Sequence, residues 1–330
     1  MAFSPGHRPL TPQAGSLTDV GLGCAPIGNL FSAVDDADSD ATLAEALDRG
    51  IRFFDTAPHY GAGVSERRLG RLLAHTDRDG LVIATKVGRQ IVDGDRAPVG
   101  PGGTGVDTIG DLSRDGVLRS LEGSLARLGT DRIDLLYLHD PADVDEALRG
   151  AWPALEELKA EGVVRSIGVG MMRNEPLTRF VNEASPDVVM VAGRLTLLDR
   201  TAGEVLLPAA RRHGVGVIAA GVYNSGILAA PRKSPYFDYH EASPDLRARA
   251  IAMEETCLAF GVTLAHAATR FALGHDPVEA IVVGARSLDE VDGLVDGMAA
   301  VIPEDLWHAL EAIQGPTGSP RATGSSSALA

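Results

Sequence analysis

Residues 133–161 read IDLLYLHDPADVDEALRGAWPALEELKAE, an apolar run that ends in a histidine and is followed by a longer segment with helical spacing. The same order, a short β-branched or apolar run and then an amphipathic segment, recurs along the chain. Such alternation is typical of parallel βαβ units. We expect strands at residues 21–25, 52–55, 81–86, 133–139, 165–170, 188–192, 215–220 and 280–284.

The amphipathic segments complete the pattern. We expect helices at residues 39–49, 65–74, 117–128, 144–161, 176–183, 202–213, 244–260 and 264–273, among others. Eight strands with interleaved helices predict the α/β class and a closed (β/α)8 TIM barrel. A doubly wound sheet usually carries G-x-G-x-x-G after its first strand, whereas residues 23–31 read GCAPIGNLF. The sequence therefore disfavours a Rossmann domain.

Three further segments matter for domain organisation. The barrel is expected to span residues 1–314. Residues 315–330 consist mainly of Gly, Ser, Pro, Ala and Thr, which bury too little surface to order alone, so a flexible C-terminal tail is expected. The connections 88–114 and 221–243 are unusually long, and long structureless loops in a compact domain are commonly lids or binding loops.

The composition narrows the functional class. Hydrophobic residues make up 45% and charged residues 23% of the chain, the balance of a globular protein. The formal charge of -15 repels phosphate groups, so we expect neither nucleic acid nor an anionic membrane surface as a partner. Cys24 and Cys257 form neither a disulfide framework nor a metal-finger spacing, and we expect no metal. With no secretory signal and no run of about 18 apolar residues, a cytoplasmic location is expected.

Polar residues stand where the expected strands end. Asp55 ends FFD, Lys86 ends LVIATK and His139 ends IDLLYLH, while Tyr60 follows in the loop DTAPHYGAG. Each alone has a structural explanation, as a turn cap, a snorkelling lysine, a satisfied core histidine or a loop aromatic. Because the carboxyl ends of barrel strands converge on one mouth, together they indicate a site. His59, beside Tyr60, is expected either to line the pocket or to be exposed.

This set of side chains suits acid–base chemistry on an oxygen. A phenol with a pKa of about 10 is a poor proton donor or base near neutrality unless a cation stabilises its phenolate. Lys86 can supply that field, and a carboxylate such as Asp55 can keep a buried lysine charged. His139 can orient the substrate oxygen by hydrogen bonding. The carbon bonded to that oxygen then becomes electrophilic enough to accept a hydride.

Three segments carry a resemblance to a known family. DTAPHYGAGVSERRLGRLL (55–73), LVIATKVG (81–88) and IDLLYLHDP (133–141) resemble signature segments of the aldo-keto reductase superfamily, and the likeness extends over residues 15–313. It implies a catalytic tetrad of Asp55, Tyr60, Lys86 and His139. It also implies an extended nicotinamide dinucleotide across the barrel mouth, taken here as NADP with NAD as the alternative.

Within the superfamily, four segments point to one branch. VAGRLTLLD (191–199), GVYNSGILA (221–229), SPYFDYHEASP (234–244) and AIVVGARS (280–287) look most like bacterial L-fucose or D-threo-aldose 1-dehydrogenases and pyridoxal 4-dehydrogenase. By the same resemblance, residues 221–228 cover the pyrophosphate, and Arg286 and Ser287 contact a 2'-phosphate. The implied cofactor contacts are Gly170, Arg194, Leu195, Gly221, Asn224, Ser225, Gly226, Leu228, Gly284, Arg286, Ser287 and Glu290.

The sequence departs from the family pattern at several cofactor positions. Leu195 stands where the family usually has a tyrosine that stacks on the nicotinamide, and Ala192 replaces a glutamine that holds the carboxamide. Gly170-Met171 stands in place of Ser-Asn. Arg194 is a hypothetical substitute for a polar role. These differences leave the choice between NAD and NADP open.

The sequence predicts an NAD(P)-dependent oxidoreductase that moves a hydride between nicotinamide and a carbonyl, alcohol or sugar lactol carbon, with Tyr60 as general acid or base. A dinucleotide-binding regulatory barrel with little catalysis is the alternative, and an epimerase or lyase is a third reading. The expected partner is a small carbonyl or sugar-like substrate. The expected assembly is a monomer or a small homo-oligomer.

Overall fold

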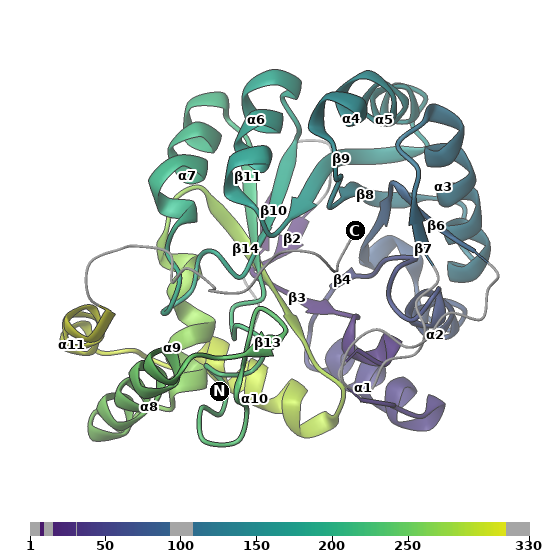
Figure 1. Cartoon of the computed structure of the whole chain (residues 1–330). Helices are drawn as coiled ribbons and strands as arrows, with labels where there is room; N and C mark the ends of the chain where they lie inside the picture. Colours follow the sequence, from purple (N-terminus) through teal and green to yellow (C-terminus); the bar gives the residue numbers. More distant parts are fainter. Residues whose placement is uncertain (1–6, 10–15, 31, 93–107, 315–330) are drawn as a thin grey trace.

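Eight parallel strands close into a barrel in the computed structural model, which describes residues 7–9, 16–30, 32–92 and 108–314. The helices surround the strands (Figure 1). The strand order around the barrel is β10-β11-β14-β3-β4-β5-β8-β9, so the predicted (β/α)8 architecture is confirmed. The barrel strands are β3 (Val20–Gly23), β4 (Phe53–Asp55), β5 (Val82–Val87), β8 (Ile133–His139), β9 (Val164–Met171), β10 (Val188–Ala192), β11 (Gly216–Ala220) and β14 (Val278–Gly284).

The register between neighbouring strands determines which side chains meet at the mouth. Asp55 pairs with Ala84, Lys86 with Tyr137, and His139 with Gly170. All of these pairings are parallel, so the carboxyl ends of β4, β5 and β8 lie side by side. The polar residues that end these strands are therefore neighbours in space.

Helices form the outer layer and mostly follow the predicted segments. The predicted helix 144–161 is an exception, because it is divided at Gly150, whose φ and ψ are -109° and -64°. A Cβ on Gly150 would lie 2.5 Å from the Leu112 carbonyl oxygen. The backbone at Gly150 is therefore too close to Leu112 for a regular helix that carries a side chain at this position. The helices are α1 (Asp36–Asp48), α2 (Val64–Leu73), α3 (Arg114–Leu128), α4 (Val144–Arg149), α5 (Ala151–Ala160), α6 (Asn174–Ala184), α7 (Ala202–His213), α8 (Pro244–Ala259), α9 (Leu264–Phe271), α10 (Leu288–Ala299) and α11 (Glu304–Gln314).

The two long connections are not structureless, contrary to prediction. Each contains a short antiparallel ribbon: β6 (Arg89–Ile91) with β7 (Thr108–Gly110), and β12 (Tyr236–Phe237) with β13 (His240–Glu241). In the second ribbon Asp238 and Tyr239 have φ values of 50° and 65°, the backbone that a two-residue hairpin turn requires. Asp238 suits the first position of such a turn, but Tyr239 stands where glycine is usual, which is why the sequence did not reveal it.

Three short helical turns and one more ribbon complete the described chain. The 3-10 turns are η1 (Pro26–Gly28), η2 (Arg78–Gly80) and η3 (Ala272–Gly274). The predicted helix 264–273 is accordingly shorter, since α9 ends at Phe271 and passes into η3. The remaining ribbon pairs β1 (His7–Pro9) with β2 (Ser16–Thr18).

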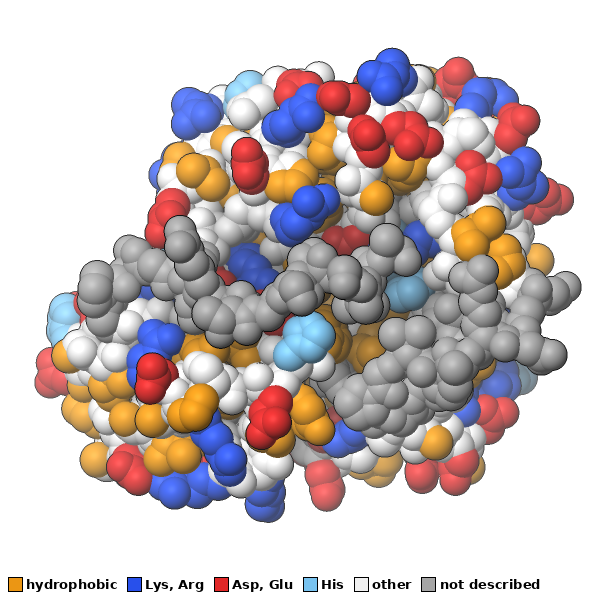
Figure 2. Space-filling view, viewed as in Figure 1, with side chains coloured by type: hydrophobic (Ala, Val, Ile, Leu, Met, Phe, Trp, Pro, Cys, Tyr) orange, Lys and Arg blue, Asp and Glu red, His pale blue; other side chains and the backbone are white. Residues whose placement is uncertain are grey.

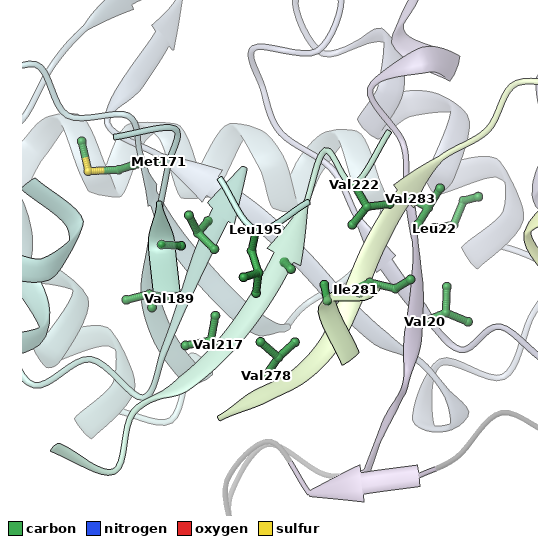
Figure 3. Close-up of a cluster of buried hydrophobic side chains, with 14 of the residues drawn as sticks. Val20, Leu22, Met171, Val189, Leu195, Val217, Val222, Val278, Ile281 and Val283 are labelled. Carbon is green, nitrogen blue, oxygen red and sulfur yellow. The ribbon is translucent and has the colours of Figure 1, made fainter. Parts of the chain in front are cut away.

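The hydrophobic core has two parts. One fills the barrel interior and includes Phe53, Tyr137 and Met190, while the larger one lies between the barrel and the helices. Figure 3 shows side chains of the larger cluster, among them Val189, Val217 and Leu195. Burial on both faces explains why the strands are near-continuous apolar runs rather than alternating ones.

The surface and the chain end complete the description. Acidic and basic side chains are interspersed on the face drawn in Figure 2. Among the described helices, no single one is long and apolar enough to cross a membrane, although the bent pair Pro244–Ala259 and Leu264–Gly274 passes by length and composition alone, with a bend of 101°. The predicted flexible tail 315–330 lies outside the described residues.

Candidate active site

A buried ion pair joins two neighbouring strands at the barrel mouth. Lys86 Nζ, at the end of β5, donates to Asp55 Oδ1 at 2.9 Å and to Oδ2 at 2.7 Å, and also to the Thr56 carbonyl at 2.9 Å. The two charged side chains are only 2% and 3% exposed. Burial raises the pKa of Asp55, and the Lys86 ammonium opposes that shift. Each charge is therefore held in the interior by its partner.

Tyr60 lies directly against this ion pair. The Lys86 Nζ atom is 4.8 Å from the centroid of the Tyr60 ring, within the range of a cation–π contact. Burial is the main cause that raises the pKa of the Tyr60 phenol well above its ordinary value, and the negative charge of Asp55 adds to the rise. The phenol is accordingly neutral at pH 7 and carries the proton that an acid catalyst needs.

The backbone of the Tyr60 turn rests on the 3-10 turn η1. A Cβ on Gly28 would lie 2.9 Å from the Tyr60 carbonyl carbon and oxygen, and one on Gly61 would lie 2.3 Å from the Gly28 carbonyl oxygen. Gly61 also has a φ of 63°, so both positions require glycine. Arg68 of α2 fixes η1 from the other side, because its Nη1 donates to the Ile27 carbonyl at 2.6 Å.

His139 completes the group at the end of β8. Its ring meets the Tyr60 ring edge-on, with 5.8 Å between centroids and an interplanar angle of 87°. Burial holds the pKa of His139 well below its usual range, and the positive charges of Lys86 and Arg89 act in the same direction. The imidazole is therefore neutral, and it can hydrogen-bond an oxygen without adding a charge. The four residues predicted for catalysis lie together.

Two more polar side chains flank His139. The His59 ring lies 5.7 Å from the His139 ring, and its Nδ1 is 2.7 Å from Thr108 Oγ1 of β7. Burial lowers the pKa of His59 to about 4, so it too is neutral at pH 7. Asp140, which the sequence analysis did not single out, places its Oδ2 3.9 Å from His139 Nε2. Its position directly after the strand-ending histidine was a signal that could have identified it.

Comparison with known proteins identifies the family. The family model described as "Aldo/keto reductase family" matches residues 19–314. The chain belongs to the aldo/keto reductase family. It is accordingly an oxidoreductase that uses a nicotinamide cofactor and acts on carbonyl or sugar substrates.

Individual relatives support this membership. D-threo-aldose 1-dehydrogenase of Pseudomonas sp is 41% identical over 92% of this chain and 96% of its own. Pyridoxal 4-dehydrogenase of Microbacterium luteolum is 38% identical, with 89% and 93% covered. Among solved structures, a holo-form aldo-keto reductase from Bacillus halodurans superposes with a TM-score of 0.78 at 25% identity, covering 94% of this chain and 96% of its own.

The loop after β11 contains several residues with left-handed backbone in this aldo/keto reductase. Gly221, Asn224, Ser225 and Gly226 have φ values of 62°, 44°, 59° and 100°. Left-handed residues in a turn can direct N–H groups toward an anion. The Asn224 Nδ2 donates to the Gly193 carbonyl at 3.0 Å, whereas its Oδ1 is buried and has no hydrogen-bond partner among the described residues. This free acceptor fits a cofactor donor.

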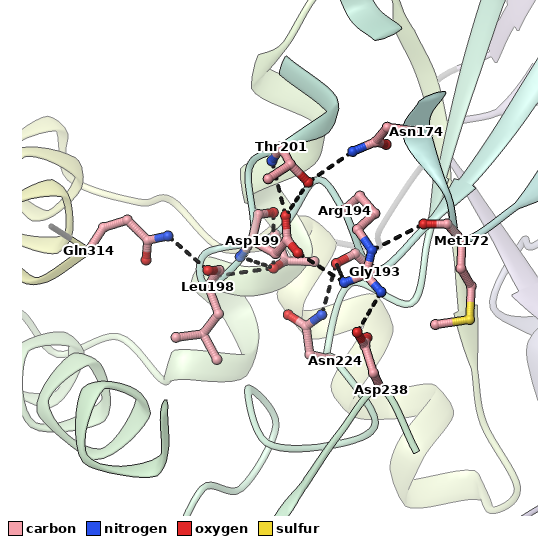
Figure 4. Close-up of polar contacts among 11 residues, drawn as sticks. Met172, Asn174, Gly193, Arg194, Leu198, Asp199, Thr201, Asn224, Asp238 and Gln314 are labelled. Atoms are coloured by element: carbon pink, nitrogen blue, oxygen red, sulfur yellow. Dashed lines mark hydrogen bonds and ion pairs between the residues drawn. The ribbon is translucent and has the colours of Figure 1, made fainter. Parts of the chain in front are cut away.

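Other implied cofactor residues are engaged within the protein. Arg194 donates to the Met172 carbonyl at 3.1 Å and forms ion pairs with Asp199 and Asp238 (Figure 4). We call this group of Arg194, Asp199 and Asp238 the loop clamp, because it joins the loop after β10 to the β12–β13 ribbon. The guanidinium is 17% exposed and is occupied by these contacts. The clamp thus holds the loops, and direct contact of Arg194 with a cofactor stays a prediction.

Three of the implied cofactor residues, Leu195, Leu228 and Gly170, are apolar or small, and their surroundings at the barrel mouth differ. Leu195 is 2% exposed and lies in the hydrophobic cluster of Figure 3, so it offers little surface to a nicotinamide ring. Leu228 is fully buried and its N–H donates to the Tyr223 carbonyl at 3.1 Å, so it shapes its loop. Gly170 lies beside the ion pair, since a Cβ there would be 4.0 Å from Lys86 Cε.

The start of α10 forms the last implied segment. Ser287 caps the helix by accepting a hydrogen bond from the Glu290 N–H at 3.3 Å. The Glu290 carboxylate accepts from the Arg286 N–H at 2.9 Å and from its Nε at 3.2 Å. Arg286 Nη1 donates to Ser32 Oγ at 3.0 Å. Gly284, at the end of β14, is exposed, and so is Arg286, so a phosphate could reach this corner.

Proposed function

We propose that this aldo/keto reductase moves a hydride between a nicotinamide cofactor and the carbonyl or lactol carbon of a polar, hydroxylated substrate, with Tyr60 as the proton donor or acceptor. The observation that carries the proposal is the contact of Tyr60 with both a buried ammonium, Lys86, and a neutral imidazole, His139. The relatives named as aldose and pyridoxal dehydrogenases support the substrate class.

Each side chain has one task in this mechanism. The bound cofactor supplies the nicotinamide carbon that gives or takes the hydride. His139 holds the substrate oxygen by a hydrogen bond, and Tyr60 donates its proton to that oxygen during reduction or accepts it during oxidation. Lys86 stabilises the phenolate that remains after proton donation, and Asp55 keeps Lys86 charged.

We further propose NADP as the preferred cofactor, with NAD as the alternative. Arg286 and the amino end of α10 provide a cation and the positive end of a helix dipole for a 2'-phosphate. The carboxylate of Glu290 is bound to Arg286 and would have to share it.

The remaining proposals concern the protein in the cell. The two buried free cysteines fit a reducing cytoplasm, and a monomer or small homo-oligomer is the proposed assembly.

Replacement of the phenol tests the central assignment. We expect Tyr60→Phe to lower kcat by about 10²–10⁴-fold, because general acid–base catalysis contributes that much, while NADPH binding measured by fluorescence stays unchanged. The matched control is Tyr137→Phe, which removes a hydroxyl that is buried near Lys86 and has no hydrogen-bond partner among the described residues. It should retain activity.

The same assay separates the proposal from its rival. Steady change in absorbance of the reduced nicotinamide with a panel of sugars and aldehydes would exclude a purely regulatory dinucleotide-binding barrel. Wild-type turnover by the Tyr60→Phe variant would show that another group moves the proton. Loss of activity in both tyrosine variants would point to a general disturbance of the barrel instead.

A further inference from the structure

Asp140 has an unusual backbone for its position. It directly follows His139 and has a φ of 42°, in the left-handed region that, apart from glycine, Asn, Asp and His adopt most often. Its N–H donates to the Gly170 carbonyl at 3.0 Å, which fixes this conformation against β9. Non-glycine residues held in such a conformation concentrate at functional sites, where the strain directs a side chain.

The two oxygens of the Asp140 carboxylate have different surroundings. Oδ1 accepts a hydrogen bond from the Met172 N–H at 3.3 Å, which orients the group. Oδ2 lies 3.9 Å from His139 Nε2, too far for a hydrogen bond. The side chain is 38% exposed, so a small molecule can reach it. Burial raises the pKa of Asp140, and the positive charge of Arg89 and the hydrogen bond from the Met172 N–H oppose that rise.

This placement is close to the reacting oxygen of the proposed reaction. An oxygen bound to His139 lies about 2.6–3.2 Å from the ring nitrogen. From there a hydroxyl on the next carbon of the substrate can extend toward Asp140 Oδ2. His59 lies on another side of the same imidazole, and Thr108 holds the His59 ring through its Nδ1. His59 therefore adds a second polar side chain to the wall of the pocket.

We propose that Asp140 is a specificity-determining residue that accepts a hydrogen bond from the hydroxyl on the carbon next to the reacting carbon. The inference rests on the proposed function and narrows its substrate class to 2-hydroxylated aldoses, present as lactols, and related 2-hydroxy carbonyl compounds. Carbonyl compounds without that hydroxyl would displace water from the carboxylate without offering a donor in its place, and sites built to hydrogen-bond a substrate hydroxyl discriminate strongly against analogues that lack it.

A substrate pair that differs only in this hydroxyl provides the test. D-Arabinose and D-ribose share one 2-deoxy analogue, 2-deoxy-D-ribose. We expect the wild type to oxidise at least one of the two pentoses with a kcat/KM about 10- to 100-fold above that for 2-deoxy-D-ribose, because hydrogen bonds to charged groups are strong. Asp140→Ala should lower kcat/KM for the pentose and leave the value for 2-deoxy-D-ribose within about three-fold of wild type, so the preference disappears.

Two further variants separate recognition from loop structure. Asp140→Asn keeps the size and an oxygen for Met172 but loses the charge, and we expect an intermediate preference. Asp143→Ala removes the side-chain cap of α4, which accepts from the Glu146 N–H at 2.9 Å in the same connection, and should leave the preference at the wild-type value. The melting temperature of each variant reports on folding.

The outcomes are distinct. Equal loss of activity on the pentose and on its 2-deoxy analogue in Asp140→Ala would overturn the inference and assign Asp140 to loop structure alone. Equal kcat/KM values for the three sugars in the wild type would also overturn it while leaving the proposed hydride transfer intact. Absence of turnover of every sugar and aldehyde by the wild type would overturn the proposed function, and this inference with it.

Discussion

Two charged clusters lie at the same mouth of the barrel, and they differ in what holds them. The Asp55–Lys86 pair comes from adjacent strands, is 2–3% exposed and contacts the Tyr60 ring. The loop clamp around Arg194 comes from two connections, and its guanidinium is 17% exposed. The first cluster is positioned by the barrel itself, whereas the second positions the loops around the barrel.

This difference distinguishes residues that act on the chemical step from residues that hold the loops in position. A strand-borne charge in the interior has little freedom, so its field on Tyr60 is preorganised. A clamp between loops can exchange partners, because Arg194 contacts two carboxylates and one carbonyl. We therefore expect a mutation in the first cluster to change the chemical step. A mutation in the clamp should change binding.

The largest effect is expected from Lys86→Met. Loss of the ammonium should lower kcat/KM by about 10³-fold, since Tyr60 loses the cation that stabilises its phenolate. It should also lower the free energy of unfolding by about 3–5 kcal/mol, because Asp55 is left buried without a partner. Steady-state kinetics and urea unfolding measure the two effects.

The double variant Asp55→Asn with Lys86→Met separates these effects. It removes the uncompensated charge, so it should recover part of the unfolding free energy and none of the activity. Recovery of activity together with stability would mean that the ion pair serves folding only, and the distinction between the two clusters would fail.

A smaller effect is expected from Arg286→Ala, at an exposed ion pair outside both clusters. We expect the KM for NADPH to rise about 5- to 30-fold while the KM for NADH changes little, because a charge-assisted hydrogen bond to the 2'-phosphate is lost. Arg71→Ala is the matched control, since Arg71 is an exposed arginine that pairs with Asp40 on the adjacent α1. Equal changes for both cofactors would remove Arg286 from the phosphate site.

The smallest effect is expected from Asp238→Asn in the loop clamp. Arg194 keeps Asp199, so the KM for NADPH should rise only about three-fold and kcat should stay near wild type, as for a partly exposed ion pair. Asp276→Asn, which weakens an exposed pair with Arg211 far along the chain, controls for general loss of charge. A ten-fold fall in kcat, roughly 1.4 kcal/mol of activation free energy, would place the clamp in the chemical step, contrary to the comparison.

The fold was largely predictable because the strands are short apolar runs between amphipathic helices. The grouping of Asp55, Lys86 and His139 was also predictable, since each ends a strand and parallel strands end at one mouth. The break at Gly150 was not, because it depends on the distance to the Leu112 carbonyl, a contact between segments far apart in the sequence. The periodicity of apolar residues along the chain carries no information about that distance.

The loop contacts were the least predictable part of the site. Arg194 is placed by carboxylates 5 and 44 residues away, and no local pattern announces such partners. The conformation of Asp140 depends on a left-handed backbone and on its neighbour on β9, and the only signal in the sequence was its position directly after His139. Leu195 was expected at the nicotinamide from the resemblance, yet its burial follows from packing that the sequence does not describe.

The close approach of Gly28 and Gly61 has a consequence for the position of Tyr60. The backbone of Tyr60 packs so closely against Gly28, and that of Gly61 against the Gly28 carbonyl, that neither glycine has space for a methyl group. The backbone that carries the phenol is thus fixed against η1, so a side chain introduced at either glycine should displace the proton donor itself as well as its loop.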